Sequence, residues 1–190
     1  MKIVIIDYGI GNVQSITNIL LLYGDTKVIL SSDEQEILNA DAVILPGVGA
    51  FKKAMEELQK RDLPNKLRKF IDTKKPFLGI CLGMQLLFDK SEEFGMTNGL
   101  GFIKGKVKKF PDVKGYKLPH VAWCNISKGS IDWKNTILKN TTDNDSFYFV
   151  HTFICYPDDQ EVILSTTNYC EVDYCSSILS DNIYARQFHP

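Results

Sequence analysis

Short apolar runs alternate with amphipathic segments through the first half of the chain. The runs contain few polar residues and several β-branched ones, a pattern typical of strands that are buried on both faces of a parallel sheet. We expect such strands at residues 2–7, 27–30, 42–45 and 76–81.

The segments between these runs have the spacing of helices. From residue 13 to residue 20 apolar side chains recur at three- and four-residue steps, and Gly24 follows as a natural helix end. Amphipathic segments are expected at residues 12–23, 32–38, 51–58 and 65–71, with a break near Leu63-Pro64. Because alternating strands and helices connect by right-handed crossovers, this half predicts an α/β fold with a mostly parallel sheet flanked by helices.

The pattern changes after residue 88. Short β-rich pieces separated by polar turns occupy residues 95–110, 147–155, 161–166, 176–179 and 183–188. The second half is therefore expected to add an antiparallel β portion to the parallel sheet. Residues 135–146 are the most polar stretch and are expected to form an exposed loop.

Length and charge narrow the class of protein. A chain of 190 residues with 44% hydrophobic residues can bury one core, so a single domain over residues 1–190 is expected. The 22 Lys and Arg nearly balance the 23 Asp and Glu, and the basic run at residues 104–109 has the alternation of a solvated strand face. We expect no nucleic-acid partner.

The chain also has few signs of export or of metal binding. No leader-like segment follows Met1, and no apolar run approaches the roughly 20 residues that span a bilayer, so we expect a cytoplasmic protein without a membrane partner. The five cysteines include no C-x-x-C pair, which argues against disulfides and against a zinc site. No metal is expected.

One cysteine lies in a distinctive context. Residues 77–87 read as a buried strand, a G-x-C-x-G turn around Cys81, and an apolar helix. This is the form of a nucleophile elbow, in which Gly79 and Gly83 relieve steric crowding while the nucleophile projects from the turn. The helix N-terminus is expected to favour the Cys81 thiolate. The plain alternative is that Cys81 is a packing cysteine.

A reactive thiol needs a base, and the chain has three histidines. His189 follows the apolar run at residues 183–188, so it lies at the carboxyl end of a strand, as Cys81 does. Ligand sites of parallel α/β sheets lie at that edge, which makes a Cys81–His189 pair plausible. His120 and His151 remain alternatives that hydrogen bonds at a loop would satisfy.

Two glycine-containing turns follow strands. Pro46-Gly47-Val48-Gly49 can direct backbone N–H groups at a developing negative charge, so it is a candidate oxyanion hole, although ordinary strand-exit chemistry explains it equally well. Residues 7–12 suggest a dinucleotide fingerprint, but Gln14 stands where the third glycine belongs. We therefore reject a nicotinamide or flavin cofactor.

The motifs together resemble the class I glutamine amidotransferases, and most closely the glutaminase subunit of imidazole glycerol phosphate synthase in histidine biosynthesis. The resemblance spans the chain in the right order, and it implies a flavodoxin-like fold without metal or organic cofactor. The motifs are Asp7-Tyr8-Gly9-x-Gly11-Asn12, Leu45-Pro46-Gly47-Val48-Gly49, Gly79-Ile80-Cys81-Leu82-Gly83-Met84-Gln85, Phe149-Val150-His151 and Gln187-Phe188-His189-Pro190.

The resemblance implies a role for each matching residue. Cys81 attacks the glutamine carboxamide and His189 moves the proton, while the oxyanion is held by the Leu82 N–H and a backbone N–H of Val48-Gly49. Ammonia then passes to a (β/α)8 cyclase subunit, which forms a heterodimer with this chain. The expected glutamine-binding residues are Gln85, His151, Thr152 and Phe153, and the expected partner-facing residues are Asn12, His120 and Trp123.

The chain departs from the family pattern in two places. The family has a Glu after His-Pro that orients the histidine, and this chain ends at Pro190, so we expect a truncated C-terminal end, lower activity and an exposed apolar sheet surface. Where the histidine-pathway family has Pro-His-x-Gly-Trp-Asn, this chain has Ala122 and Cys124 around Trp123.

These departures leave alternatives open. A paralogue that feeds ammonia to another acceptor enzyme, such as one that modifies a surface sugar, has the same elbow. A non-catalytic regulatory subunit would keep the fold without a working triad. An esterase or a cysteine protease fits less well, because no acidic residue lies near His189 in the sequence.

Overall fold

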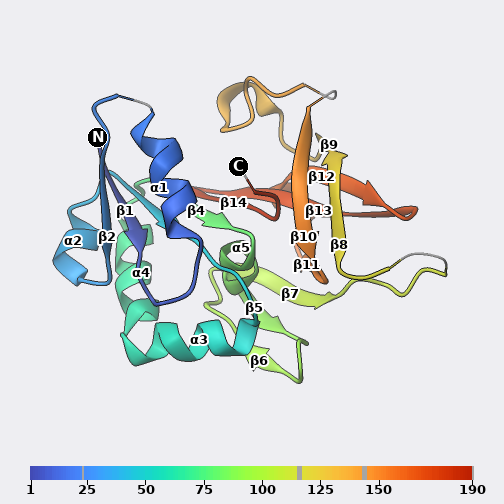
Figure 1. Ribbon diagram of the computed structural model, residues 1–190, viewed down its shortest axis with the longest axis horizontal. Coiled ribbons are helices and arrows are strands. Elements are labelled where there is room, and N and C mark those ends of the chain that lie inside the picture. The colour runs from blue at the N-terminus through green and yellow to red at the C-terminus, as the bar shows by residue number, and fades with distance from the viewer. Residues whose placement is uncertain (23, 115–116, 143–144, 190) are drawn as a thin grey trace.

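The chain folds around one long sheet whose first half is parallel (Figure 1). The computed structural model describes residues 1–22, 24–114, 117–142 and 145–189. Five neighbouring strands of this sheet are parallel, and all five overlap segments that were predicted to be β. In spatial order they are β2 (Lys27–Ser31), β1 (Lys2–Ile6), β3 (Ala42–Leu45), β4 (Phe77–Ile80) and β14 (Ile183–Arg186).

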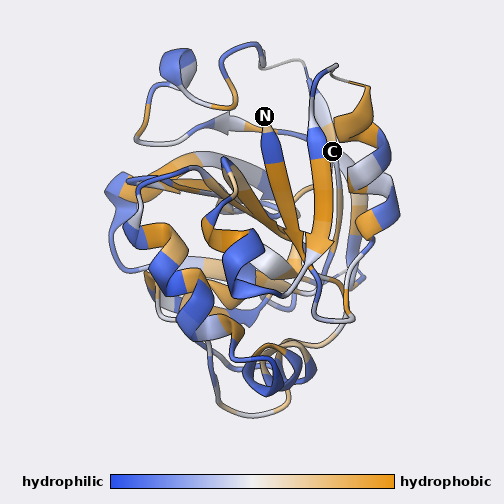
Figure 2. Cartoon of the chain, turned by 90° about the vertical axis from the view of Figure 1, so that its left-hand side faces the viewer, coloured by the Kyte–Doolittle hydropathy of each residue, from blue (hydrophilic) through white to orange (hydrophobic). Residues whose placement is uncertain are grey.

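Helices cover both faces of the parallel strands. Successive side chains of a strand point to opposite faces, so Ile3 and Ile5 of β1 pack with Ile16 of α1 (Val13–Leu21). Val4 and Ile6 pack on the other face, which is covered by α2 (Glu34–Leu38), α3 (Phe51–Lys60) and α4 (Leu63–Asp72). Figure 2 shows the apolar strands between helices whose outer surfaces are largely hydrophilic.

The helices begin where local capping allows. Asn12 accepts from the Ser15 N–H at 3.3 Å, so α1 starts one residue later than predicted; the predicted end at Tyr23 lies outside the described residues. Asp33 caps α2 in the same way. Pro64 lies in the first turn of α4, where its missing N–H removes no intrahelical bond, so this helix begins before the residue 65 that was predicted.

The second half of the chain continues the sheet with antiparallel strands, as predicted. Beyond β14 the order is β13 (Val172–Ser180), β11 (Phe153–Pro157), β7 (Ile103–Lys109), β5 (Phe88–Ser91) and β6 (Thr97–Asn98), with β5 and β7 parallel to each other. β12 (Ile163–Tyr169) and β9 (Ser127–Lys128) pair beside β13. A separate antiparallel pair, the two-stranded sheet, consists of β8 (His120–Asn125) and β10 (Ser146–His151).

Two predictions for this half need correction. The single β piece at residues 147–155 is two strands, because the chain leaves the two-stranded sheet at Thr152 and enters the main sheet as β11. The polar stretch at 135–146 is only partly exposed. Thr136 and Leu138 are buried after the 3-10 turn η1 (Trp133–Asn135), and residues 143 and 144 lie outside the described part. The other 3-10 turn is η2 (Gln160–Val162).

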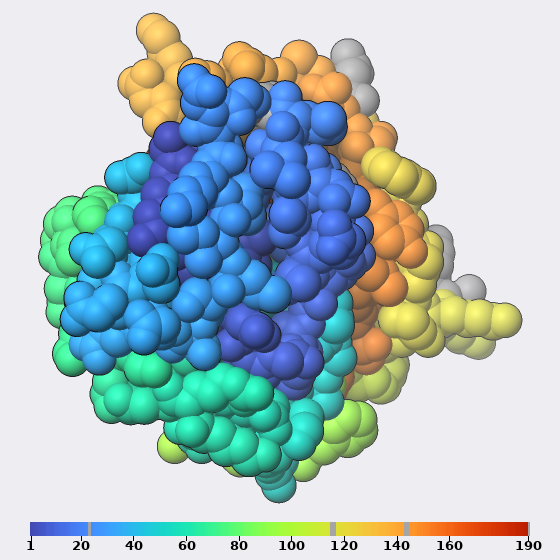
Figure 3. Space-filling model, turned by 60° about the vertical axis from the view of Figure 1, so that its left-hand side comes forward, coloured from blue at the N-terminus to red at the C-terminus, as the bar shows by residue number. Residues whose placement is uncertain are grey.

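The two-stranded sheet lies beside the N-terminal region. In Figure 3 the blue side chains that include α1 adjoin the orange and yellow side chains of β10 and β8. A bridge between Tyr148 and His189 joins this sheet to the end of β14, and aromatic side chains pack beneath it. Within the described ranges, no helix is long and apolar enough to cross a bilayer.

Candidate active site

Cys81 lies in the sharp turn between β4 and the short helix α5 (Leu82–Leu86). Its backbone has φ 55° and ψ −113°, a conformation that is rare outside glycine. A Cβ on Gly83 would collide with the Leu45 carbonyl, and a Cβ on Gly79 would lie 2.9 Å from the Gly83 carbonyl oxygen. The two glycines therefore let α5 pack directly on β3 and β4, which is the strand, turn and helix that the motif predicts.

The Cys81 thiol is buried. Its side chain is 8% exposed, and burial raises its pKa to about 11. The Leu82 N–H and the Gln187 amide act in the opposite direction but are weaker. The expectation that the helix end favours the thiolate is therefore wrong for this structure, because desolvation outweighs what a five-residue helix supplies. The thiol is the resting form.

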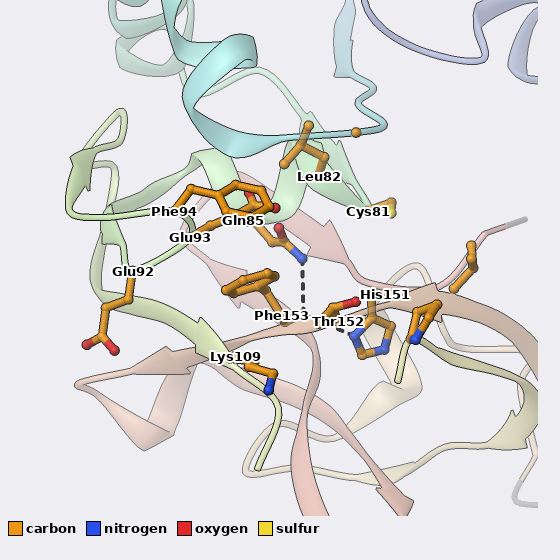
Figure 4. Close-up of a pocket in the computed structure, with 13 residues that line it drawn as sticks. Cys81, Leu82, Gln85, Glu92, Glu93, Phe94, Lys109, His151, Thr152 and Phe153 are labelled. Atoms are coloured by element: carbon orange, nitrogen blue, oxygen red, sulfur yellow. Dashed lines mark hydrogen bonds between the residues drawn. The ribbon is translucent and has the colours of Figure 1, made fainter. Parts of the chain in front are cut away.

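A cavity of about 600 Å3 opens beside Cys81, within the ~300–1,000 Å3 usual for small-molecule sites (Figure 4). Its walls come from the β3–α3 connection, from α5, from the β5–β6 turn, from the end of β7 and from the β10–β11 junction. The predicted site residues that line it are Gly49, Cys81, Leu82, Gln85, His151, Thr152 and Phe153. The structure thus brings the proposed nucleophile and the proposed substrate-binding segment into one cavity.

Charged residues that no sequence pattern predicted line the far wall of this cavity. Glu92 and Glu93 line it from the β5–β6 turn, and Lys109 lines it from the end of β7. One Glu93 oxygen accepts from the Phe51 N–H at 2.6 Å, which ties the turn to α3. The only available signal was an acidic pair after a short strand, and the sequence does not show that this turn faces α5.

Gln85 is held by hydrogen bonds inside the cavity wall. Its Nε2 donates to the Phe153 carbonyl at 3.2 Å and to Oε1 of Gln187 at 2.9 Å. Gln187 in turn places its Nε2 3.6 Å from the Cys81 sulfur. Hydrogen-bonded polar side chains therefore connect the predicted substrate-binding segment to the thiol.

His189 and Cys81 follow neighbouring strands, as predicted, but they line different cavities. β14 pairs with β4 in parallel, with Arg186 opposite Ile80. Among the hydrogen bonds of the described residues, none joins His189 to Cys81. His189 donates its backbone N–H to the Tyr148 carbonyl at 3.0 Å and lines a second cavity of about 350 Å3.

The His189 ring is suited to accept a proton. Burial lowers its pKa, and the nearby Arg186 charge lowers it further. The ring is therefore neutral at neutral pH, as a general base must be. Among the described contacts of this ring, the hydrogen bond to the thiol that a Cys-His pair requires is the missing element.

The turn after β3 contributes one residue to each of the two cavities. Gly49, at φ +84°, faces the cavity of Cys81, whereas Val48 lines the cavity of His189. Tyr8 is fully buried and donates its hydroxyl to the Pro46 carbonyl at 2.7 Å, so it holds this turn in place. The oxyanion role of Val48, Gly49 and Leu82 stays a prediction.

The predicted partner-facing residues differ in their exposure to solvent. Asn12 is exposed and lines the cavity of His189, and Trp123 is 71% exposed. His120 is fully buried, so its prediction as a surface contact is wrong. It lies on the inner face of β8, where the alternation of the strand points it away from Trp123 and towards the main sheet.

His120 belongs to a buried hydrogen-bonded network. The Phe153 carbonyl can only accept, so Nδ1 of His151 donates to it at 3.0 Å, and Nε2 of His151 accepts from the Tyr174 hydroxyl at 3.2 Å. The Tyr174 oxygen then accepts from Nδ1 of His120 at 3.2 Å, and Nε2 of His120 faces the Cys124 thiol at 3.4 Å. The rings of His120 and His151 are thus satisfied by hydrogen bonds, on strands rather than at a loop.

The chain belongs to the family described as Glutamine amidotransferase class-I, which matches residues 4–190. It is therefore a glutamine amidotransferase, an enzyme class that uses a Cys-His pair. Among similar curated proteins, the imidazole glycerol phosphate synthase subunit HisH of Aquifex aeolicus is 43% identical over 193 residues, covering all of this chain and 89% of that protein. The HisH subunit of Prochlorococcus marinus is 42% identical, covering all of this chain and 90% of its own.

Solved structures support the fold. A structure described as a glutamine amidotransferase superposes with a TM-score of 0.70 at 14% identity, covering 98% of this chain and 89% of its own. PurLQS from Thermotoga maritima also gives 0.70 at 14% identity, covering 99% and 86%. At this identity the likeness confirms the predicted class I glutamine amidotransferase fold and nothing further.

Proposed function

We propose that this chain is the glutaminase subunit of an imidazole glycerol phosphate synthase. It hydrolyses glutamine to glutamate and ammonia, and it passes the ammonia to a (β/α)8 cyclase subunit with which it forms a heterodimer in histidine biosynthesis. The observation that carries the proposal is the 43% identity, over the whole chain, to a protein named as the HisH subunit of that synthase. The reaction needs no metal or organic cofactor.

Cys81 is the proposed nucleophile, because it stands at the elbow and lines the cavity. Its sulfur adds to the carboxamide carbon of glutamine, and the tetrahedral intermediate collapses to a thioester as ammonia leaves. Water then adds to the thioester, glutamate leaves and the thiol is restored. His189 takes the thiol proton, gives it to the departing ammonia and later takes a proton from the attacking water.

The backbone around Cys81 suits a developing negative charge. The Leu82 N–H lies next to the sulfur and already interacts with it. Gly49 brings the turn after β3 to the same cavity, and Tyr8 holds that turn through the Pro46 carbonyl. We propose that Leu82 and the Val48-Gly49 turn form the oxyanion hole.

The charged wall suits the amino-acid end of glutamine. Glu92 and Glu93 offer carboxylates to its ammonium group, and Lys109 on the same wall offers a cation to its carboxylate. The Oε1 of Gln85 and the backbone at His151, Thr152 and Phe153 complete the proposed binding site. This arrangement leaves the carboxamide pointing towards Cys81.

The base has to approach the thiol for this reaction. His189 is tied by its backbone to Tyr148 of β10, so a displacement of the two-stranded sheet would carry the ring with it. We propose that the synthase subunit docks on the exposed side of this sheet. The surface there contains Asn12, Val48, Val121 and Trp123, which are exposed beside the cavity of His189.

A second candidate is a paralogue that supplies a different acceptor enzyme. Ala122 and Cys124 flank the exposed Trp123, where the histidine-pathway pattern has Gly and Asn. A third is a non-catalytic regulatory subunit, which is favoured by the missing Cys81–His189 hydrogen bond.

Glutamate production from glutamine, with and without a histidine-pathway synthase subunit and its acceptor, tests all three candidates. We expect partner-dependent turnover that disappears in Cys81→Ala. A synthase subunit that neither binds nor stimulates the chain overturns the histidine assignment. Covalent labelling of Cys81 by a glutamine-like electrophile would then favour the paralogue, and no labelling would favour the regulatory subunit.

A further inference from the structure

Gln187 is a buried polar residue to which the proposed mechanism gives no role. It follows β14 and is 1% exposed, and its backbone N–H donates to the Ser176 carbonyl at 2.8 Å. Its side chain points at the nucleophile, with Nε2 3.6 Å from the Cys81 sulfur, within the range of a hydrogen bond to sulfur. A buried amide is usually placed by its partners, and here the partners lie in the active site.

The orientation of this amide follows from its neighbours. The Phe153 carbonyl can only accept, so Gln85 must present its NH2 group to it, at 3.2 Å. The same NH2 group lies 2.9 Å from Gln187, which must therefore offer its oxygen. Gln187 is left with its own NH2 group facing the sulfur. The Phe153 carbonyl thus determines the orientation of the Gln85 amide, and through it the orientation of the Gln187 amide.

An N–H donor beside the sulfur has two chemical consequences. It stabilises the thiolate, which accepts hydrogen bonds better than the neutral thiol. It also cannot accept the thiol proton, so that proton has to point away from Gln187. Together with the Leu82 N–H, Gln187 opposes the burial that raises the Cys81 pKa.

We propose that Gln187 positions the Cys81 sulfur and stabilises its thiolate, and that Gln85 controls this interaction by orienting the Gln187 amide. Because Gln85 also lines the cavity, a glutamine molecule that displaces its hydrogen bond to Phe153 alters the donor at the sulfur. The inference rests on the proposed role of Cys81 as nucleophile. It adds a link between substrate binding and thiol reactivity.

The test is the pH dependence of Cys81 alkylation by iodoacetamide, followed by mass spectrometry of the peptide that contains Cys81. Gln187→Met keeps the length of the side chain but removes the donor. We expect its midpoint to rise by about one pH unit, which slows alkylation roughly tenfold below the midpoint. Gln85→Met is expected to shift the midpoint in the same direction by less, because Gln187 keeps its donor but loses its orientation.

Gln160→Met is the matched control. Gln160 is exposed and lies outside the active site, and its side chain donates one hydrogen bond to the Pro157 carbonyl at 2.8 Å. The alkylation midpoint should move in Gln187→Met and stay at the parent value in Gln160→Met. A folded Gln187→Met protein whose profile coincides with that of the parent overturns the proposal.

A further variant keeps the test decisive if Gln187→Met does not fold. Gln187→Glu preserves the shape and the oxygen that accepts from Gln85, and its ionised carboxylate should raise the midpoint further. An unchanged midpoint in this variant also overturns the proposal. Alkylation needs neither glutamine turnover nor a partner, so failure of the proposed function, seen as turnover that survives Cys81→Ala, is a separate result.

Discussion

The elbow, formed by β4, Cys81 and α5, and the two-stranded sheet, formed by β8 and β10, meet at the candidate active site but are built differently. The elbow is almost wholly buried, and Gly79 and Gly83 set its shape through backbone contacts. The two-stranded sheet exposes Trp123 and Val121 and joins the main sheet through the Tyr148–His189 bridge.

The proposed nucleophile and the proposed base therefore lie in regions that are held in place differently. The proposed nucleophile lies in a turn whose backbone packs tightly against β3, and the proposed base lies where β14 meets the exposed two-stranded sheet. Burial keeps the Cys81 thiol protonated in this arrangement. Substitutions in the elbow, in the hydrogen bonds that hold the two-stranded sheet, and at its exposed tryptophan should therefore have different effects.

The largest effect is expected at the elbow. Gly83→Ala places a Cβ against the Leu45 carbonyl, a backbone group that cannot move aside, so the free energy of unfolding should fall by about 3 kcal/mol or more. Urea denaturation measures this. In Gly24→Ala the new Cβ meets no atom within 4 Å, and only its φ of +66° opposes it, so a loss of about 1 kcal/mol is expected. Equal losses in the two variants would contradict the account of the elbow.

Detaching the two-stranded sheet should have an intermediate effect. Tyr174→Phe leaves ring nitrogens of His120 and His151 without their partner, which should lower the free energy of unfolding by about 2 kcal/mol. Tyr156→Phe removes a hydroxyl from a partly exposed tyrosine and should change stability by less than about 0.5 kcal/mol. A Tyr174→Phe protein as stable as the parent would show that the network does not hold the sheet.

The exposed tryptophan should matter for binding rather than for folding. Trp123→Ala is expected to weaken association with the synthase subunit at least tenfold, about 1.4 kcal/mol, because large exposed aromatic residues dominate interfaces. Isothermal titration calorimetry measures this. Met96→Ala, at a 62% exposed position in the β5–β6 turn, should bind as the parent does. Similar losses in both variants would place the interface elsewhere.

The smallest effect is expected from pH. Burial lowers the pKa of His120 to about 4. Burial, together with the charge of His120, lowers the pKa of His151 to about 3. Both rings therefore stay neutral in the folded protein at neutral pH, whereas in the unfolded chain they take up protons near pH 6.5. The contribution of these two rings to the free energy of unfolding is therefore complete above pH 6.5 and is lost as the pH falls. Between pH 7 and pH 6 the free energy of unfolding should fall by about 1 kcal/mol.

Urea denaturation at pH 7 and pH 6 gives this slope, and nuclear magnetic resonance of the folded protein supplies its control. The ring signals of His120 and His151 should not titrate between pH 8 and pH 5. A midpoint near 6.5 for either ring would contradict the buried network.

Local patterns predicted the elbow and the first four parallel strands, because each is encoded within about ten consecutive residues. They did not separate β10 from β11, since the apolar pattern continues across Thr152 while the chain changes sheets. They also did not place Glu92 and Glu93, whose turn reaches the cavity only after β5 pairs with β7.

The sequence by itself determined the class of fold, the turn that presents Cys81 and the edge of the sheet at which His189 lies, because hydrophobic periodicity and glycine spacing are local properties. Only the tertiary structure decided that burial raises the pKa of Cys81, that His120 faces inwards and that Gln187 faces the sulfur. Desolvation and hydrogen bonding depend on segments about 100 residues apart that pack together, and no local pattern records which segments those are.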